Sequence, residues 1–457
     1  MSFKTINPAT EEILKEYQEM SYSEIDEIII KSNNCFKHWR KTSFSERSKL
    51  MLNAASILRK RKNEYAELMA LEMGKPLAQG ISEAEKCAWV CEYYAENVTL
   101  QLQDEPIKTE MSDSFVTYQP IGTVLAIMPW NFPFWQVFRF AAPALMAGNA
   151  GILKHARNTM GCAIKIEEIF KEAGFPEYLF SNLIISSSPV PKIIEHPLIA
   201  VVTLTGSTPV GQEVASKAGS VIKKTVMELG GSDPYIVLED ADLEKTASTC
   251  VSARLINSGQ SCISAKRFIV VESIYPQFVT LFTEKMRAAV MGNPLDPAVT
   301  IGPQARKDLQ SDLHRQVADS IKSGAKLLLG GNLPEGKGFF YPPTVLVDVS
   351  PGMAAFDEET FGPVAAIIPV KDELEAIKMA NKTIFGLGAA VFTSDIERGR
   401  RIARDELQAG ACFVNAFVRS DPRLPFGGVK MSGYGRELSS FGIKEFMNIK
   451  TVCVDYI

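Results

Sequence analysis

One cysteine of this chain lies in an unusual loop of small polar residues. The stretch NSGQSCISAKR, residues 257–267, places Cys262 between serines and close to Gly259. The thiolate form of cysteine is a nucleophile, and it needs access and polar or positive surroundings to react. Glycine also lets main-chain groups approach closely. A buried structural thiol is the other interpretation and fits the other cysteines, but the polar loop favours a reactive Cys262.

Two further side chains could take part in chemistry at such a thiol. Glu228 in MELGG follows apolar residues and precedes two glycines, and burial there would raise the pKa of its carboxyl group toward use as a base. Asn131 in PWNFP lies just beyond an apolar run, where its amide would be a preorganised hydrogen-bond donor. A paired glutamate at a strand end and a turn with packed aromatic rings are the structural alternatives.

A glycine-rich turn in TGSTPVG, residues 205–211, could bind an anion. A turn between a strand and a helix directs main-chain N–H groups and the helix dipole toward a negative charge. The pattern is neither GxGxxG nor a Walker loop. By itself, a structural strand-to-helix turn is therefore the simpler interpretation.

Alternating helices and strands must position these residues. Ser43 and Glu46 have the spacing of a capping box, and apolar residues recur on one face, which predicts a long helix over 43–73. Strands are expected at 122–129 and 200–207, a helix at 134–147, and a second α/β series from residue 233. This pattern predicts an α/β fold with mostly parallel sheets in two interlocked domains. The end segment IKTVCVDYI alternates as an exposed strand, which is consistent with association of chains.

Composition and charge exclude several function classes. The 457 residues are 46% hydrophobic and 22% charged with a formal net charge of −4, which is typical of a soluble protein of two or three domains. The balanced charge predicts no nucleic-acid partner, and no membrane span is expected. The N-terminal stretch lacks the apolar core of a signal peptide, and the eight cysteines indicate a cytoplasmic protein without a disulfide framework. Cys87 and Cys91 in CAWVC are interpreted as helix packing, and no metal is expected.

Taken together, these segments resemble those of the aldehyde dehydrogenase superfamily. The motifs PWNFP, TGST, MELGG, NSGQSC, ETFGPV and PFGGVKMSGYGRE occur in the order and spacing of that family, and the resemblance covers essentially the whole chain. Within the superfamily, the chain is most similar to the succinate-semialdehyde dehydrogenases. The resemblance implies a Rossmann-like NAD(P)-binding domain with a parallel sheet, an interlocked α/β catalytic domain and a small β oligomerisation element, in a homodimer or homotetramer. The implied ranges are 1–104 with 121–229, then 230–430, and 105–120 with 431–457.

The resemblance also assigns catalytic roles. It implies that Cys262 attacks the aldehyde carbon, and that the Asn131 side chain and the main-chain N–H of Cys262 stabilise the resulting oxyanion. Glu228 matches the base that activates water to hydrolyse the thioester left after hydride transfer. The implied reaction is the NAD(P)-dependent oxidation of an aldehyde, with succinate semialdehyde as the expected substrate.

For the cofactor, the resemblance implies a set of contact residues. These are Trp130, Asn131, Lys154, Arg157, Ser207, Thr208, Leu229 and Glu359. Many NAD-preferring relatives have KPAE where this chain has KHAR, so Arg157 replaces an acidic residue that binds the adenosine 2′-hydroxyl. A positive charge favours a 2′-phosphate, which predicts that NADP is accepted and slightly favoured over NAD. The alternative is an Arg157 side chain that points to solvent.

Arg139 and Ser420 match residues that bind the distal carboxylate of the substrate in succinate-semialdehyde dehydrogenases. A guanidinium suits a carboxylate because it donates two parallel hydrogen bonds. Ile256 occupies a position that is basic in some relatives. Ser264 stands where several relatives have a second cysteine, so a disulfide switch at Cys262 is not expected.

Three other functions stay open on the sequence alone. A broader-specificity aldehyde dehydrogenase would take other small aldehydes. A CoA-acylating relative would pass the acyl group to CoA, but it would not need the hydrolytic base Glu228. A binding protein that kept the fold and lost the chemistry is disfavoured by the presence of Cys262, Glu228 and Asn131.

Overall fold

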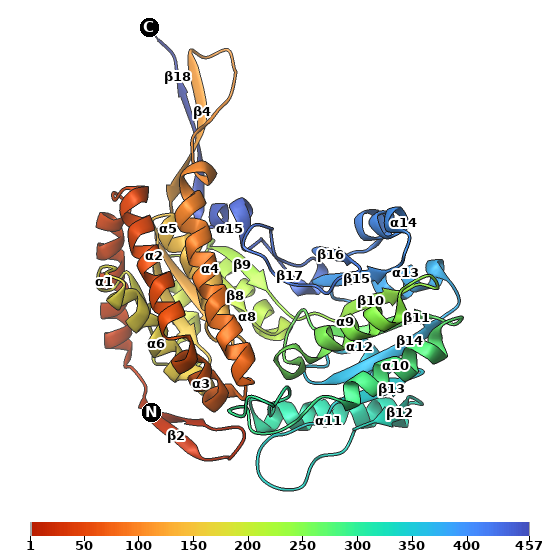
Figure 1. Ribbon diagram of the computed structural model, residues 1–457. Helices are drawn as coiled ribbons and strands as arrows, with labels where there is room; N and C mark the ends of the chain where they lie inside the picture. Colours follow the sequence, from red (N-terminus) through yellow and green to blue (C-terminus); the bar gives the residue numbers. More distant parts are fainter. Residues whose placement is uncertain (1, 457) are drawn as a thin grey trace.

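Two large sheets, each covered by helices on both faces, organise the protein (Figure 1). The computed structural model describes residues 2–456. A small three-stranded sheet projects from one end of the molecule. A hairpin of β1 (Ser2–Ile6) and β2 (Ile13–Gln18) lies near the opposite end. The predicted α/β class with mostly parallel sheets is confirmed.

The first sheet is parallel except at one edge. In spatial order its strands are β17 (Gly433–Tyr434), β9 (Lys224–Glu228), β8 (Ile199–Thr205), β5 (Thr123–Met128), β6 (Ala150–His155) and β7 (Phe180–Asn182). Only the pair of β17 and β9 is antiparallel among these neighbours in the described residues. The chain runs outward from β5 to β7 and then returns to the other side of β5 as β8. The strand order therefore reverses between β5 and β8, which is where ligands bind in open α/β sheets.

The side chains of β5 show that this sheet is buried on both faces. Val124, Ala126 and Met128 pack in one core, and Leu125 and Ile127 pack in another. The helices of the first core are α2 (Phe44–Lys60), α3 (Lys62–Met73), α4 (Leu77–Gln101), α5 (Trp135–Met146) and α6 (Met160–Glu172). Those of the second are α1 (Tyr22–Trp39), α7 (Val190–Glu195) and α8 (Thr208–Ser220), although Phe36 and Trp39 at the end of α1 pack in the first core. Burial on both faces explains why the strands are continuous apolar runs.

The second sheet is built in the same way. In spatial order its strands are β12 (Lys326–Leu329), β13 (Thr344–Val347), β14 (Val364–Val370), β11 (Ala265–Val271), β10 (Asp233–Val237), β15 (Gly388–Phe392) and β16 (Ala411–Val414). The edge strand β12 is antiparallel to β13, and the other pairs are parallel. One face carries α9 (Leu243–Leu255) and α10 (Tyr275–Arg287). The other carries α11 (Lys307–Lys322), α12 (Ala354–Asp357) and α13 (Glu373–Asn381).

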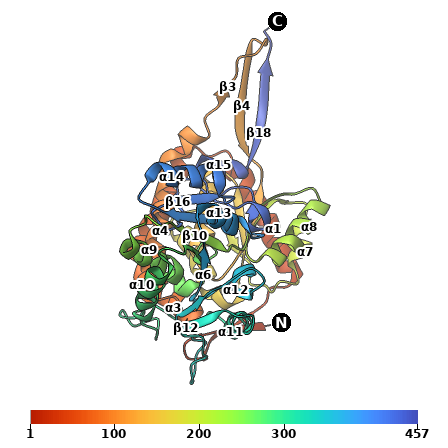
Figure 2. The same cartoon turned by 90° about the vertical axis from the view of Figure 1, so that its right-hand side faces the viewer.

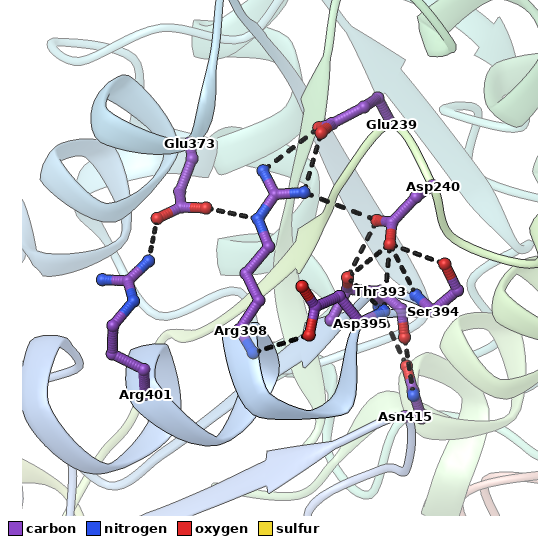
Figure 3. A network of polar contacts seen from close by, with 9 residues as sticks. All are labelled: Glu239, Asp240, Glu373, Thr393, Ser394, Asp395, Arg398, Arg401 and Asn415. Atoms are coloured by element: carbon purple, nitrogen blue, oxygen red, sulfur yellow. Dashed lines mark hydrogen bonds and ion pairs between the residues drawn. The ribbon is translucent and has the colours of Figure 1, made fainter.

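A network of polar contacts joins the loops that follow β10 and β15 (Figure 3). Asp240 accepts hydrogen bonds from the hydroxyls of Thr393 at 2.8 Å and Ser394 at 2.6 Å, and from the main-chain N–H of Asp395 at 3.0 Å. Arg398 of α14 (Ile396–Arg401) forms an ion pair with Asp240 at 3.7 Å. These contacts hold the ends of two neighbouring parallel strands together, far along the sheet from its edge strand β12.

The projecting sheet is formed by segments that are distant in the sequence. β4 (Asp113–Pro120) pairs antiparallel with β3 (Glu105–Pro106) and with β18 (Met447–Val454). Figures 1 and 2 show it extending away from the body of the molecule. Ile449 on β18 is 60% exposed. The neighbouring segment 433–434, which the sequence prediction grouped with this element, adds β17 to the first sheet. The domain boundaries themselves stay a prediction.

The predicted long helix over 43–73 is interrupted in the structure. Ser43 and Glu46 form the expected capping box, but Arg61 has a φ of −108° and separates α2 from α3. The break contains neither glycine nor proline, so the sequence pattern gives no signal for it. None of the helices within residues 2–456 combines the length and apolar character that crossing a membrane requires.

Candidate active site

Four predicted site residues lie where strands of the first sheet end. Trp130 and Asn131 follow β5, Ser207 follows β8, and Glu228 is the last residue of β9. Parallel strands end at the same edge of a sheet, so these residues gather at the point where the strand order reverses. The helix α8 begins directly after Ser207.

The loop that carries Cys262 has a left-handed backbone just before the thiol. Asn257, Ser258 and Gly259 have φ angles of 53°, 56° and 78°. Such angles cost a non-glycine residue about 1–3 kcal/mol, and they persist only where surrounding contacts fix them. A Cβ atom on Gly259 would lie 2.2 Å from the main-chain oxygen of Gly362, so only glycine fits there. The small residues of this loop therefore serve close packing as well as access.

Hydrogen bonds tie this loop to Asn131 and to the segment just before α11. The Asn131 Nδ2 donates to the main-chain oxygen of Gln260 at 3.1 Å, and the Asn257 Nδ2 donates to the main-chain oxygen of Asn131 at 2.7 Å. The Gln260 side-chain oxygen accepts from the N–H of Ala305 at 2.9 Å. Asn131 is 4% exposed. The structure thus brings the amide of Asn131 and the loop of Cys262 together and holds both.

Cys262 is half-buried beside two cations. The Lys266 Nζ donates to the main-chain oxygen of Cys262 at 2.7 Å. Burial raises the pKa of the Cys262 thiol to about 12, although the charges of Arg139 and Lys266 act in the opposite direction. The thiol is therefore protonated near neutral pH in the structure as it stands, and it needs a proton acceptor to react.

Glu228 is enclosed together with a second carboxylate and one arginine. Glu228 is 2% exposed, and neither of its carboxylate oxygens has a hydrogen-bond partner among the described residues. Arg139 forms a buried ion pair with Glu437. Burial holds the pKa of Glu228 well above its usual range; the Arg139 charge lowers it and the Glu437 charge raises it further. A buried carboxyl group with a raised pKa is suited to accept a proton.

A cavity of about 380 Å³ lies at this edge, and loops of both sheets line it. Of the predicted site residues, six line it: Trp130, Asn131, Ser207, Leu229, Cys262 and Glu359. The Glu359 carboxylate accepts from the N–H of Gly231 at 2.9 Å and lies 3.5 Å from the Lys266 ammonium. A Cβ atom on Gly231 would lie 2.7 Å from the main-chain oxygen of Cys262. The glycines of MELGG therefore allow the loops after β9 and before β11 to meet.

The other predicted cofactor residues lie outside the lining of this cavity. Lys154 is buried near the end of β6, whereas Arg157 is exposed, with its guanidinium 5.9 Å from the ring centre of Phe3. Thr208 donates to the main-chain oxygen of Met431 at 3.2 Å. Burial lowers the pKa of Lys154 to about 8, and the charge of Arg157 lowers it further.

The donor set fits a phosphate-bearing dinucleotide. Lys154 and Arg157 form no ion pair with a carboxylate among residues 2–456. The side chain of Ser207, the N-cap of α8, makes no capping hydrogen bond. Two cations and the amino end of a helix are the groups that bind phosphate in proteins. The Trp130 ring and the Glu359 carboxylate line the cavity described above, where they would contact the remaining parts of such a molecule.

A second cavity, of about 570 Å³, opens on the other side of the PWNFP segment. Phe132 and Trp135 line it, while Asn131 and Gln136 line the first cavity. Its remaining lining includes residues from five segments: Gln79, Glu83, Lys86, Leu255, Ile256, Lys285, Thr300 and Phe417. The segment 131–136 thus forms a wall shared by both cavities.

The structure does not bring the two predicted substrate residues into one contact. Arg139 is 2% exposed; its guanidinium is paired with Glu437 and donates to the Thr205 hydroxyl at 3.2 Å. The Ser420 hydroxyl instead accepts a hydrogen bond from the Lys86 Nζ at 2.7 Å. Carboxylate binding by Arg139 therefore stays a prediction, and it would require Arg139 to share its charge with Glu437.

Three charged residues at the site were not identified from the sequence: Lys86, Lys266 and Glu437. Lys86 lies on α4 among residues that are mostly buried. A cation among the apolar residues of a predicted helix is the sequence signal that could have identified it. Glu437 ends the motif PFGGVKMSGYGRE, where only the glycines attract notice. Lys266 directly follows the thiol loop.

Comparison with known proteins decides the family. A model of the aldehyde dehydrogenase family matches residues 1–452. The chain belongs to the aldehyde dehydrogenase family. Membership gives this aldehyde dehydrogenase the family activity, the NAD(P)-dependent oxidation of aldehydes, and confirms the resemblance of its motifs.

Its relatives narrow the comparison. It is 47% identical over 454 residues to a probable NADP+ succinate-semialdehyde dehydrogenase of Synechocystis, covering 99% of this chain and 100% of that protein. It is 47% identical over 457 residues to NADP+ succinate-semialdehyde dehydrogenase 1 of Mycobacterium tuberculosis, with the same coverage. The crystal structure of succinic semialdehyde dehydrogenase from Streptococcus pyogenes in complex with NADP+ superposes with a TM-score of 0.97 at 36% identity, covering 99% of this chain and 100% of that chain.

Proposed function

We propose that this aldehyde dehydrogenase oxidises succinate semialdehyde to succinate with NADP+, through a thioester on Cys262. The observation that carries the proposal is that Cys262 and Asn131 line one cavity and are tied by a hydrogen bond through Gln260, while the buried Glu228 lies close enough for its charge to act on the Cys262 thiol. The relatives named above act on this substrate and cofactor by their names, which supports the choice of both.

In the first step the Cys262 thiol gives its proton to a water molecule, and the sulfur forms a bond with the aldehyde carbon while the π electron pair of the C=O bond moves to the oxygen. The aldehyde oxygen then carries negative charge, and hydrogen-bond donors must be in place to stabilise it. An amide nitrogen carries two hydrogens. One hydrogen of the Asn131 amide is held by Gln260, and we assign the other to the oxyanion, with the main-chain N–H of Cys262. Loss of one such donor costs about 10²–10³ in rate.

The dinucleotide, when bound, supplies the hydride acceptor. Trp130, Ser207, Leu229 and Glu359 would hold it in the first cavity. Lys154 and Arg157 would place two positive charges near a 2′-phosphate, which favours NADP over NAD. Thr208, the first residue of α8, would contact the dinucleotide at the amino end of that helix.

The second chemical task is hydrolysis of the thioester. Glu228 would take a proton from water while the water oxygen attacks the thioester carbon, and the Cys262 sulfur would leave. A positioned base contributes about 10²–10⁴ in rate. Arg139 would limit how far burial raises the pKa of Glu228, since its charge favours the ionised carboxylate. The presence of this base favours water over CoA as the acyl acceptor.

We further propose that the projecting sheet of β3, β4 and β18 mediates assembly into a homodimer or homotetramer. The sheet extends from the body, and Ile449 and Val454 on it are exposed. An uncovered strand edge with apolar side chains favours pairing with another chain. Light scattering on the full chain and on a variant shortened before Met447 would test this, because the shortened chain is expected to be monomeric.

A panel of initial rates tests the proposed function. The substrates are succinate semialdehyde, glutarate semialdehyde and butanal, each with NAD+ and NADP+. We expect the highest kcat/KM for succinate semialdehyde with NADP+. A higher value for butanal would contradict the substrate assignment, and a strong preference for NAD+ would contradict the role of Arg157. A faster reaction with added CoA, giving acyl-CoA, would contradict hydrolysis.

A further inference from the structure

Lys86 extends into the second cavity from the middle of α4. Its Nζ donates to the Ser420 hydroxyl at 2.7 Å and lies 4.3 Å from the ring centre of Trp135. Phe132, Trp135 and Ile256 give the same cavity apolar walls. The ammonium group is therefore held at a fixed place by a hydroxyl and an aromatic face, in surroundings that are otherwise mainly apolar.

The acidic groups nearest to Lys86 are engaged elsewhere. Glu83 forms a buried ion pair with Lys75 and accepts hydrogen bonds from the N–H groups of Phe134 and Trp135, both at 2.9 Å. Asp421 pairs with Arg423 at 2.7 Å. Lys86 itself has no carboxylate within ion-pair distance in the described chain.

Neighbouring charges do not neutralise Lys86 either. Arg139 is also a cation, and it lies close enough for its charge to repel that of Lys86. Arg139 itself is paired with Glu437. The remaining ionisable groups that act on Lys86 are Cys87, Glu83 and Asp421, and burial remains the largest influence, lowering the pKa of Lys86 to about 8. The cavity contains one other lysine, Lys285, which is paired with Glu244.

We infer that Lys86, together with Ser420, binds the carboxylate at the far end of the aldehyde substrate. The inference rests on the proposed function, and it adds the group that gives specificity for an anionic aldehyde. Residues of the segment 131–136 line both the cavity of Cys262 and that of Lys86, and form a wall that the two cavities share. A short aldehyde that reaches around this wall would have its carbonyl at the thiol, its methylene groups against Phe132 and Trp135, and its carboxylate at Lys86.

A carboxylate beside Lys86 stabilises the ammonium form, so binding and protonation are linked. Binding of succinate semialdehyde should weaken as pH rises above about 8, where Lys86 loses its charge. Binding of an uncharged aldehyde of the same carbon-chain length, butanal, should not change over this range through Lys86. The ratio of the two kcat/KM values removes every pH effect that the substrates share.

The test compares Lys86→Met with the wild type on both aldehydes at pH 7. We expect kcat/KM for succinate semialdehyde to fall about 10- to 100-fold, mainly through KM, because a hydrogen bond to a charged group is lost. We expect kcat/KM for butanal to stay within about twofold. Lys86→Arg, which keeps the charge, should recover part of the loss. Lys192→Met is the matched control, since Lys192 also lies over a ring, 4.4 Å from the centre of Tyr22, outside both cavities.

The outcomes separate the two proposals. If the wild type prefers butanal, the proposed function fails whatever the variants do. If the wild type prefers succinate semialdehyde but Lys86→Met leaves that preference unchanged, or lowers both activities equally, the assignment of Lys86 is wrong. Should Lys86→Met not fold, the wild-type ratio of the two kcat/KM values decides. A ratio that falls through pH 8 supports Lys86, and a ratio that is flat from pH 7 to 9 overturns it.

Discussion

Arg139 and Glu437 form an ion pair inside the protein, and Glu228 lies within reach of both charges. Arg139 is 2% exposed and Glu437 is 1% exposed. Burial raises the pKa of both carboxyl groups, and Arg139 lowers both. One cation therefore serves two carboxylates, and the protonation of Glu228 depends on Glu437.

The first prediction concerns this dependence. Glu437→Gln removes a negative charge that raises the pKa of Glu228, so the pKa of Glu228 should fall. Since the base acts when it is deprotonated, the acidic limb of the pH profile of kcat should move to lower pH. The measurement is kcat against pH with succinate semialdehyde, under conditions in which thioester hydrolysis limits the rate. A shift to higher pH, in a variant with an unchanged melting temperature, would contradict the coupling.

The second prediction concerns the base itself. Glu228→Gln keeps the shape of the side chain but cannot take a proton from water, so hydrolysis should slow by about 10²–10⁴. Formation of the thioester does not need that step. Rapid-mixing measurements should show a burst of NADPH close to one equivalent per subunit, followed by slow turnover. A variant that loses the burst together with the turnover would show that Glu228 is needed before the thioester forms.

The third prediction concerns cofactor choice. Arg157→Asp replaces an exposed positive charge near Lys154 by a negative one. Repulsion of the 2′-phosphate should raise the KM for NADP+ at least tenfold, while the KM for NAD+ changes little, since NAD+ has a hydroxyl at that place. Equal changes for both cofactors would place Arg157 away from the 2′-phosphate. The matched control is Arg40→Asp, because Arg40 is also an exposed arginine over a phenylalanine ring, 5.3 Å from the centre of Phe36.

The fourth prediction concerns stability and the network in Figure 3. Burial alone would raise the pKa of Asp240, but hydrogen bonds from Ser394 and Thr393 outweigh it and lower the pKa to about 2. A depressed carboxyl pKa stabilises the fold above the unfolded value near 4, and this contribution is lost as pH falls toward 2. Asp240→Asn should therefore lower the free energy of unfolding at pH 7 by about 1–3 kcal/mol. The difference from the wild type should shrink in acid; a difference that is constant from pH 7 to 3 would contradict the assignment.

Much of the fold could be predicted from the sequence because it rests on local patterns. The apolar runs of β5 and β8 and the capping box at Ser43 are encoded by neighbouring residues. The break at Arg61 was not predictable, since no glycine or proline marks it; α2 and α3 on either side of it both pack against α4. Local pattern thus defines which elements form, and tertiary packing defines where some of them end.

The candidate site was predictable to a different degree. Cys262, Asn131 and Glu228 stand in motifs with distinctive composition, so the sequence singled them out. The partners of Arg139 were not predictable, because Glu437 lies 298 positions further along the chain and reaches Arg139 only through the fold. The same holds for Lys86 and Ser420, which are 334 positions apart. Charge pairing across such separations is set by topology, which the residue types alone do not reveal.

The most direct test of the account is the mass of the Cys262 peptide from Glu228→Gln. The variant is mixed with succinate semialdehyde and NADP+, quenched in acid and digested, and the peptides are analysed by mass spectrometry. The account predicts one succinyl group, bound as a thioester that hydroxylamine removes, on the peptide that contains Cys262. A succinyl group on any other cysteine, or NADPH formation with an unmodified Cys262 peptide, would contradict it.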